Sequence, residues 1–132
     1  MSSSLATLRP VVLVTGGAKR LGRAIALDLA AHGFDVAVHY RGSKEEALAT
    51  VKELQSLGAA AAMFQADLSD ETACRALVPA VAAQFKRIDA VVNNASTFEY
   101  DNPETFSSTA MDKHWRANTA PAVLLADRKS VV

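Results

Sequence analysis

The sequence predicts an α/β fold, a doubly wound parallel sheet of about four strands, on three observations. Short apolar runs alternate with amphipathic segments of helical length. The first run, Val11–Val14, is apolar on both faces, which is typical of a central strand in a parallel sheet. Glycines stand where two of the amphipathic segments would end, at Gly33 and Gly58. Strands that alternate with helices in this way form right-handed βαβ units.

A glycine-rich turn follows the first strand. Gly16, Gly17 and Gly22 are expected to provide a tight turn, a close approach of backbone to a ligand and a close contact with the next helix. The helix N-terminus, with unpaired N–H groups and the positive end of the dipole, suits a pyrophosphate. The alternative is an ordinary strand-turn-helix without a ligand.

The first helix is expected to place Leu21, Ile25 and Leu29 on one apolar stripe and to end near residues 32–33. Residues 34–39 form the second predicted strand. Ser43 is expected to cap a second helix that runs to Leu57. The third strand, over residues 59–65, is predicted mainly from its place in the alternation, because it is poor in β-branched residues.

A third helix is predicted to open at residues 69–71. Its apolar face is formed by Leu77, Val78, Val81 and Phe85. Pro79 lies inside it and is expected to kink or split it. Residues 88–93 then form the fourth predicted strand.

The domain organisation is expected to be one incomplete dinucleotide-binding domain over residues 10–126, preceded by a loose arm over residues 1–9. Its C-terminal part is predicted as a loop over residues 94–109 and a helix over about residues 110–126. Residues 127–132 break the apolar pattern abruptly, which predicts an atypical tail and a truncated chain.

Composition excludes several classes of function. Apolar residues make up 50% of the chain, and 14 Lys and Arg balance 14 Asp and Glu, so neither nucleic acid nor a membrane is expected as a partner. Cys74 is the only cysteine, which excludes an intrachain disulfide and favours a cytoplasmic location. The three histidines have no metal-ligand spacing, so no metal site is predicted.

The end of the second strand indicates the cofactor. NAD sites usually place a carboxylate here for the ribose 2′-hydroxyl. The segment His39-Tyr40-Arg41-Gly42-Ser43 instead offers a cation, a hydroxyl and the start of a helix. That combination suits a 2′-phosphate and therefore NADP(H), with a solvated basic turn as the alternative.

Two motifs carry a family resemblance. Thr15-Gly16-x-x-x-Arg20-x-Gly22 resembles the T-G-x-x-x-G-x-G turn of short-chain dehydrogenases/reductases, and its arginine resembles the pteridine reductase branch. Asn93-Asn94-Ala95-Ser96 resembles the N-N-A-G element of the same family, with serine in place of glycine. The resemblance implies a Rossmann-like sheet, an NADP-dependent oxidoreductase, a small-molecule substrate and, for an intact member, a homo-oligomer.

The resemblance also implies residue roles. Asp67, at the end of the third strand, would bind the adenine amino group, although a loop-capping aspartate is an equal alternative. The cofactor-binding residues expected are Gly16, Lys19, Arg20, Leu21, Gly22, His39, Tyr40, Arg41, Ser43, Ala66, Asp67, Leu68, Asn94, Ala95 and Ser96.

Substrate residues are expected from the pteridine reductase resemblance. Arg20 and Ser96 would contact a pterin, and Phe98 would stack on it, unless Phe98 is a loop aromatic packed on the core. Asn118 matches the asparagine of the family's catalytic tetrad and would hold a proton-relay water, with a helix asparagine beside a proline kink as the alternative. A ketoacyl or sugar carbonyl as substrate remains open.

The family's catalytic serine, tyrosine and lysine have no candidates. No tyrosine follows Asn118, and the match Tyr40-x-x-x-Lys44 lies at the adenosine end of the expected site, so it is judged accidental. The general acid is therefore missing, and the chain as given is expected to bind cofactor without reacting. A non-catalytic NADP-binding sensor or interaction module is the alternative from another class.

Overall fold

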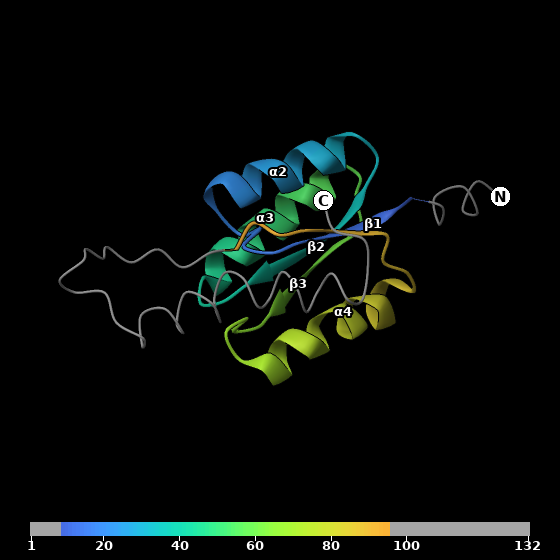
Figure 1. Cartoon of the computed structure of the whole chain (residues 1–132). Coiled ribbons are helices and arrows are strands. Elements are labelled where there is room, and N and C mark those ends of the chain that lie inside the picture. Colours follow the sequence, from blue (N-terminus) through green and yellow to red (C-terminus); the bar gives the residue numbers. More distant parts are fainter. Residues whose placement is uncertain (1–8, 96–132) are drawn as a thin grey trace, which may run out of the picture.

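The computed structural model describes residues 9–95, which form a parallel sheet between two layers of helices (Figure 1). The elements in order are β1 (Val11–Val14), α2 (Arg20–Ala31), β2 (Asp35–Tyr40), α3 (Lys44–Ser56), β3 (Ala61–Gln65), α4 (Glu71–Phe85) and β4 (Ala90–Val92). The predicted alternation of strand and helix is confirmed, with strand ends shifted by one or two residues. Ser96, Phe98 and Asn118, with the predicted loop beyond residue 95, the predicted last helix and the tail, lie outside the described residues.

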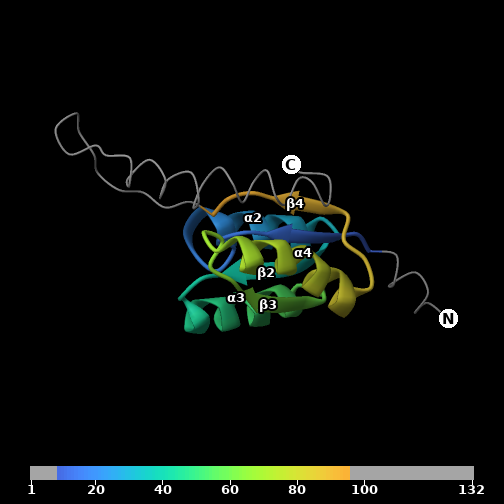
Figure 2. The same ribbon diagram turned by 60° about the horizontal axis from the view of Figure 1, so that its bottom comes forward.

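The four strands are parallel and stand in the order β3-β2-β1-β4 (Figure 2). The chain advances from β1 through β2 to β3 and then crosses back to place β4 on the other side of β1. In register, Val12 pairs with Val36 on one side and with Ala90 on the other. This reversal opens a crevice at the carboxyl ends of β1 and β4, the usual place for a ligand in such sheets.

The central strand β1 is buried on both faces, as its sequence predicts. Val12 and Val14 pack in a cluster with α2 and α3, while Val11 and Leu13 pack in a second cluster with α4. Figure 1 shows the same arrangement, with α2 and α3 on one face of the sheet and α4 on the other. All four side chains are at most 2% exposed, so β1 joins the two cores.

Helix α2 differs from the prediction in its buried stripe. Gly22, Ala26 and Ala30 are its buried residues, and Leu21 is 66% exposed. Small side chains face the sheet because the helix approaches it closely, and a residue adjacent to Gly22 is rotated about 100° away from that face. Leu21 therefore lies outside the apolar stripe, at the rim of the pocket described below.

Helix α4 runs through Pro79 as one element, so the proline does not split it, while the alternative of a kink stays a prediction. Pro79 lies on the exposed side of the helix. Proline has no N–H group, so the carbonyl of Arg75, four residues earlier, has no helical donor. Arg75 is exposed, and water can donate to this carbonyl instead. The buried side carries Cys74, Leu77, Val78 and Val81, which keep the helix on the sheet.

The amino ends of the strands are held together by charged side chains. Arg9 donates from Nε to Asp35 Oδ1 at 2.8 Å and from a terminal nitrogen to the Phe34 carbonyl at 2.9 Å. Asp35 Oδ1 also accepts the N–H of Ala60 at 2.9 Å, and Asp89 Oδ2 accepts that of Val11 at 2.8 Å. The expectation of a loose arm over residues 1–9 therefore does not extend to Arg9.

Candidate functional site

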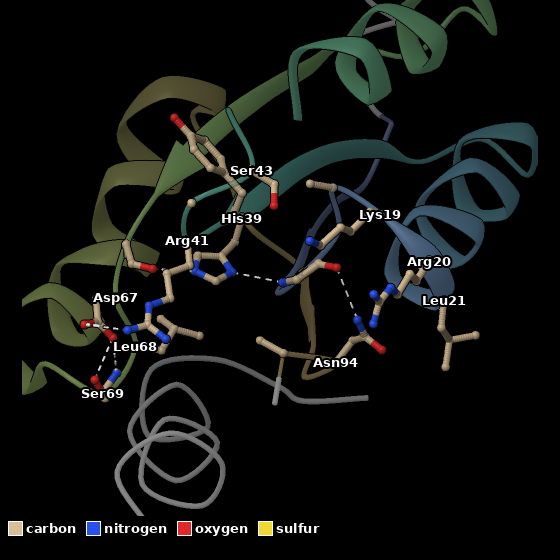
Figure 3. Close-up of a pocket in the computed structure, with 16 residues that line it drawn as sticks. Lys19, Arg20, Leu21, His39, Arg41, Ser43, Asp67, Leu68, Ser69 and Asn94 are labelled. Carbon is tan, nitrogen blue, oxygen red and sulfur yellow. Dashed lines mark hydrogen bonds and ion pairs between the residues drawn. The ribbon is translucent and has the colours of Figure 1, made fainter. Parts of the chain in front are cut away.

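A pocket of about 590 Å³ lies at the carboxyl ends of all four strands (Figure 3). Its lining residues come from the turn after β1 and the segments that follow β2, β3 and β4: Gly16, Ala18, Lys19, Arg20, Leu21, His39, Tyr40, Arg41, Gly42, Ser43, Ala66, Asp67, Leu68, Ser69, Asn94 and Ala95. Every cofactor residue predicted within residues 9–95 is in this set except Gly22, which packs behind the turn. The geometry thus gathers the predicted residues around one pocket, while their contacts with a cofactor stay a prediction.

The glycine turn is built by close backbone packing. Gly16 has φ 63°, a left-handed conformation that glycine adopts without a steric penalty. A Cβ on Gly22 would lie 2.0 Å from the Gly16 carbonyl oxygen and 2.6 Å from Asn94 Nδ2. Asn94 Nδ2 occupies this space and donates to that oxygen at 3.3 Å. The first turn of α2 can therefore reach the pocket only because residue 22 has no side chain.

Thr15 ties the end of β1 to the end of β4. Thr15 is only 1% exposed, and its hydroxyl oxygen accepts hydrogen bonds from the N–H groups of Asn94 at 2.9 Å and Ala95 at 3.0 Å. It also lies 3.3 Å from the Val92 carbonyl, which receives the Thr15 N–H. These bonds join segments almost eighty residues apart and hold the Asn94-Ala95 segment beside the glycine turn.

His39 lies at the centre of the site and bridges two of its walls. Its Nδ1 accepts the Gly16 N–H at 2.9 Å, and its Nε2 lies 2.8 Å from the Ala66 carbonyl oxygen. The residue is 2% exposed, and burial lowers the pKa of the imidazole, a shift that the bond to Ala66 partly opposes. The two ring nitrogens therefore contact backbone groups of two different segments, the glycine turn and the end of β3.

The N-terminus of α2 opens toward the pocket. Its N-cap residue, Lys19, makes no side-chain capping bond, and the first turn has no acidic residue. The leading N–H groups of a helix have no intrahelical partner, so this end attracts an anion. Arg20 is exposed and has φ 56°, a strained value for a residue with a Cβ, which accounts for the glycine usual at this position of the motif.

The end of β2 presents one arginine. The side chain of Arg41 is 68% exposed and lies 3.8 Å from Asp67 Oδ2, a loose ion pair that Figure 3 also shows. Ser43 caps α3 by position, yet its side chain makes no capping hydrogen bond. Helix α3 begins with Lys44, Glu45 and Glu46, none of which lines the pocket, so Arg41 is the cation that the segment after β2 presents to it within the described residues.

Asp67 caps the loop after β3, and its contact with an adenine stays a prediction. Its Oδ1 accepts the Ser69 hydroxyl at 2.6 Å and the Ser69 N–H at 3.0 Å. These bonds, with a smaller contribution from Arg41, lower the pKa of the Asp67 carboxyl. Asp67 is therefore held as a carboxylate, with Oδ2 turned toward Arg41.

The two residues of the match Tyr40-x-x-x-Lys44 differ in their surroundings. Tyr40 is 9% exposed and belongs to the core cluster with α2 and α3, while Lys44 is the exposed first residue of α3.

Within residues 9–95 no three His, Cys, Asp or Glu side chains form a potential metal site. In the same range, none of the helices is both long and apolar enough to span a bilayer.

Sequence reasoning missed one buried contact of the turn. The hydroxyl of Thr50, on α3, donates to the Ala18 carbonyl at 2.8 Å, and the residue is 1% exposed. The sequence does contain a signal for this contact, because Thr50 is a polar residue on the same buried stripe of α3 as Ala47, Val51 and Leu54. Ala18, Gly42 and Ser69 also line the pocket and were not predicted.

Known proteins share both the sequence and the fold. A 3-oxoacyl-(acyl-carrier-protein) reductase FabG of Staphylococcus aureus is 45% identical over 83 residues, 63% of this chain and 34% of that protein. FolM alternative dihydrofolate reductase 1 from Brucella canis, solved with NADP, is 38% identical with a TM-score of 0.82, over 89% of this chain and 48% of that one. A short-chain dehydrogenase from Burkholderia cenocepacia, also solved with NADP, is 36% identical with a TM-score of 0.86, over the same shares of the two chains.

The chain spans from about a third to about half of the length of these relatives. The family model described as short chain dehydrogenase matches residues 10–128, which is most of the chain. Within the described residues the matched range includes the glycine turn, the parallel sheet and Asn94. The chain therefore belongs to the short-chain dehydrogenase family.

Proposed function

We propose that the pocket binds NADP(H), with the pyrophosphate over the N-terminus of α2 and the adenosine 2′-phosphate beside Arg41. The fit rests on the donors available. The first turn of α2 has no side-chain cap, and the missing Cβ of Gly22 lets α2 pack closely against the glycine turn at the pocket. The two NADP-bound structures described above, which cover nearly the whole of this chain, support the same cofactor.

Arg41 carries the choice of NADP(H) over NAD(H). Its guanidinium is largely exposed, is only loosely paired with Asp67, and stands where an NAD site places a carboxylate. A 2′-phosphate would gain charge-assisted hydrogen bonds from Arg41 and reach the unused hydroxyl of the N-cap residue Ser43. Ala66, Asp67 and Leu68 would line the adenine, and Asn94, Ala95 and Ser96 the rest of the cofactor.

The test compares NADPH and NADH binding to wild type and Arg41→Ala by calorimetry. Arg41→Ala is expected to weaken NADPH binding about tenfold, because a charged hydrogen bond of about 1.4 kcal/mol is lost, and to leave NADH binding nearly unchanged. Arg75→Ala, which removes an exposed arginine paired with Glu71 on α4, is the matched control. Unchanged NADPH affinity in Arg41→Ala contradicts the assignment, and an equal loss for both cofactors would mean that Arg41 acts on folding rather than on the phosphate.

The reaction proposed for the intact enzyme is reduction of a pterin. Bound NADPH supplies the hydride. Arg20, at the pocket rim, would contact the pterin together with Ser96 and Phe98, and Asn118 would hold the proton-relay water. The left-handed backbone of Arg20 favours this role, since strain in a non-glycine residue is retained where the side chain is needed. The 38% identity to a dihydrofolate reductase of the FolM type also favours a pterin-like substrate.

A ketoacyl thioester is the second candidate, favoured by the 45% identity to the staphylococcal 3-oxoacyl reductase. Titration of the NADPH-loaded protein with a dihydropterin and with an acetoacetyl thioester separates the two. The pterin assignment predicts that only the dihydropterin binds and that Arg20→Gly weakens it. Binding of the thioester alone would transfer the assignment to ketoacyl reduction.

We also propose that the 132 residues by themselves bind cofactor without turnover, because they include no counterpart of the family's catalytic serine, tyrosine and lysine. Absorbance of NADPH with a dihydropterin present is expected to stay constant. The intact mass of the native polypeptide complements this assay. A mass of 14.0 kDa would favour a non-catalytic NADP-binding module, and about twice that mass would mean that a catalytic half accompanies this one.

A further inference from the structure

We propose that His39 is a positioning residue of the dinucleotide site, whose neutral ring holds the Gly16 amide and thereby sets the shape of the glycine turn. The proposal deepens the proposed function, because the turn is the part of the pocket assigned to the pyrophosphate. It differs from a direct contact between His39 and the cofactor, since the ring is buried and both nitrogens face backbone groups.

The hydrogen bonds define one protonation state of the ring. The Gly16 N–H can only donate, so Nδ1 must be the acceptor at 2.9 Å. The Ala66 carbonyl can only accept, so Nε2 must carry the proton at 2.8 Å. A neutral imidazole with the proton on Nε2 satisfies both groups. The imidazolium has two donors and no acceptor, so it would leave the Gly16 N–H without its partner.

His39 holds two successive amides of the turn. Its ring accepts from Gly16, and its backbone carbonyl accepts the Gly17 N–H at 3.0 Å. Gly16 is the residue with φ 63°, and its own carbonyl receives Asn94 Nδ2. Loss of the ring contact would free one of these amides while the other stays anchored. The expected result is a turn that samples other conformations and presents its N–H groups less accurately to a phosphate.

The surroundings of the ring make this state stable near neutral pH. Burial lowers the pKa of His39, so the neutral form dominates above about pH 6.5. β1 and β3, which flank the strand, contain no ionisable side chain. By the alternation of β2, His39 lies on the α4 side, where the ionisable residues are Glu71, Cys74 and Arg75. The charged residues that line the pocket with it are Lys19, Arg20, Arg41 and Asp67.

The sign of the pH effect follows from the lowered pKa. Above the ordinary histidine pKa the ring is neutral in both the folded and the unfolded chain. As the pH falls below it, the unfolded chain takes up a proton that the folded chain resists, so folding is destabilised. The contact with Gly16 is lost when the pH falls through the lower, folded-state pKa. Cofactor affinity should decrease over the same interval.

The first measurement uses the cofactor-free protein. Nitrogen-15 NMR of the His39 ring is expected to show the proton on Nε2 near neutral pH, and the Gly16 amide signal should titrate together with the ring. A proton on Nδ1, or a Gly16 amide that does not follow the ring, would overturn the proposal. This result does not depend on whether the pocket binds NADPH.

The second measurement is NADPH affinity between about pH 7.5 and about pH 5 in wild type, His39→Asn and His39→Leu. The asparagine oxygen can accept from Gly16 without titrating, whereas leucine cannot accept. His39→Leu is expected to weaken binding about tenfold at the higher pH and His39→Asn by less. Wild type should lose more affinity on acidification than His39→Asn, over the pH interval in which the NMR titration shows the His39 ring taking up its proton. Titration of the cofactor's own phosphate is common to both proteins and cancels in the comparison.

His32→Asn is the control, because the side chain of His32, the C-cap residue of α2, is 72% exposed. Equal NADPH affinities of wild type and His39→Asn at a pH where NMR shows the His39 ring protonated would contradict the proposal. If His39→Leu does not fold, the asparagine variant and the NMR titration still decide it. If wild type binds no NADPH at any pH, the proposed function fails, while the NMR result on Gly16 and His39 stands by itself.

Discussion

The two edges of the sheet use polar groups in opposite ways. At the amino ends of the strands, carboxylates hydrogen-bond to the ends of neighbouring segments. Asp35 accepts from the Ala60 N–H and from Arg9, and Asp89 accepts from the Val11 N–H. At the carboxyl ends, the N-terminus of α2 has no side-chain cap, and Arg41 keeps only a loose ion pair. Polar groups at the amino ends of the strands are thus hydrogen-bonded within the protein, whereas some at the carboxyl ends remain available to a ligand.

Even at the carboxyl edge, the groups behind the pocket are paired within the protein. Thr15, His39 and Thr50 are each at most 2% exposed, and all three hydrogen-bond to backbone groups of the turn or of the Asn94 segment. The helix α4 begins at the same edge but is capped by Asp70, which accepts the Thr72 N–H at 3.0 Å. The site therefore combines the uncapped N-terminus of α2 and the loosely paired Arg41 with a support whose polar groups are hydrogen-bonded within the protein.

The largest effect on stability and on NADPH binding is expected at Gly22, where α2 packs against the glycine turn of the pocket. Gly22→Ala places a Cβ 2.0 Å from the Gly16 carbonyl oxygen, so either α2 or the turn must move. We expect a loss of at least about 3 kcal/mol in the free energy of unfolding and no measurable NADPH binding. Urea denaturation and calorimetry measure the two quantities.

Gly42→Ala is the control for Gly22→Ala. Gly42 lines the same pocket, and nothing lies within 4 Å of the Cβ it would gain. The control is expected to change stability by less than about 0.5 kcal/mol. A Gly22→Ala protein as stable as Gly42→Ala would show that the close packing of α2 on the turn is not required.

The next largest effect is expected at Asp35, where a substitution at the amino ends of the strands tests whether the carboxyl ends are affected. Asp35→Ala removes the acceptor of the Ala60 N–H and of Arg9, and we expect stability to fall by about 2 kcal/mol. NADPH affinity of the folded fraction should change less than about twofold, because the substitution is at the edge opposite the pocket. Asp28→Ala, which removes an exposed carboxylate near His32, is the control. Weaker NADPH binding without a loss of stability in Asp35→Ala would mean that the edges are not independent.

The smallest expected effect is at the support behind the pocket. Thr50→Val keeps a β-branched side chain but removes the buried donor to the Ala18 carbonyl, which should cost about 1 kcal/mol of stability. NADPH binding is expected to weaken about threefold, since Ala18 belongs to the turn. Thr72→Val, on the exposed surface of α4, is the matched substitution. Equal effects of the two substitutions on NADPH affinity would leave Thr50 without a role in the site.

Much of the candidate site could be predicted from local sequence. The residues that end parallel strands meet at one edge of a sheet, so the strand ends alone group the turn after β1, the Arg41 segment, the Asp67 segment and Asn94. The glycine spacing likewise predicts where backbone must approach backbone. These inferences succeed because strand direction and glycine requirements are local properties of the chain.

The sequence by itself determined the strand-helix alternation, the apolar central strand, the glycine turn and the absence of a carboxylate at the end of β2. Only the tertiary structure decided the strand order, the small-residue stripe that turns Leu21 outward, and the single helix through Pro79. It also decided that His39 and Thr50 hold the turn, across separations of 23 and 32 residues. These features depend on which distant groups are brought within hydrogen-bonding or van der Waals distance, and spacing along one segment contains no information about that.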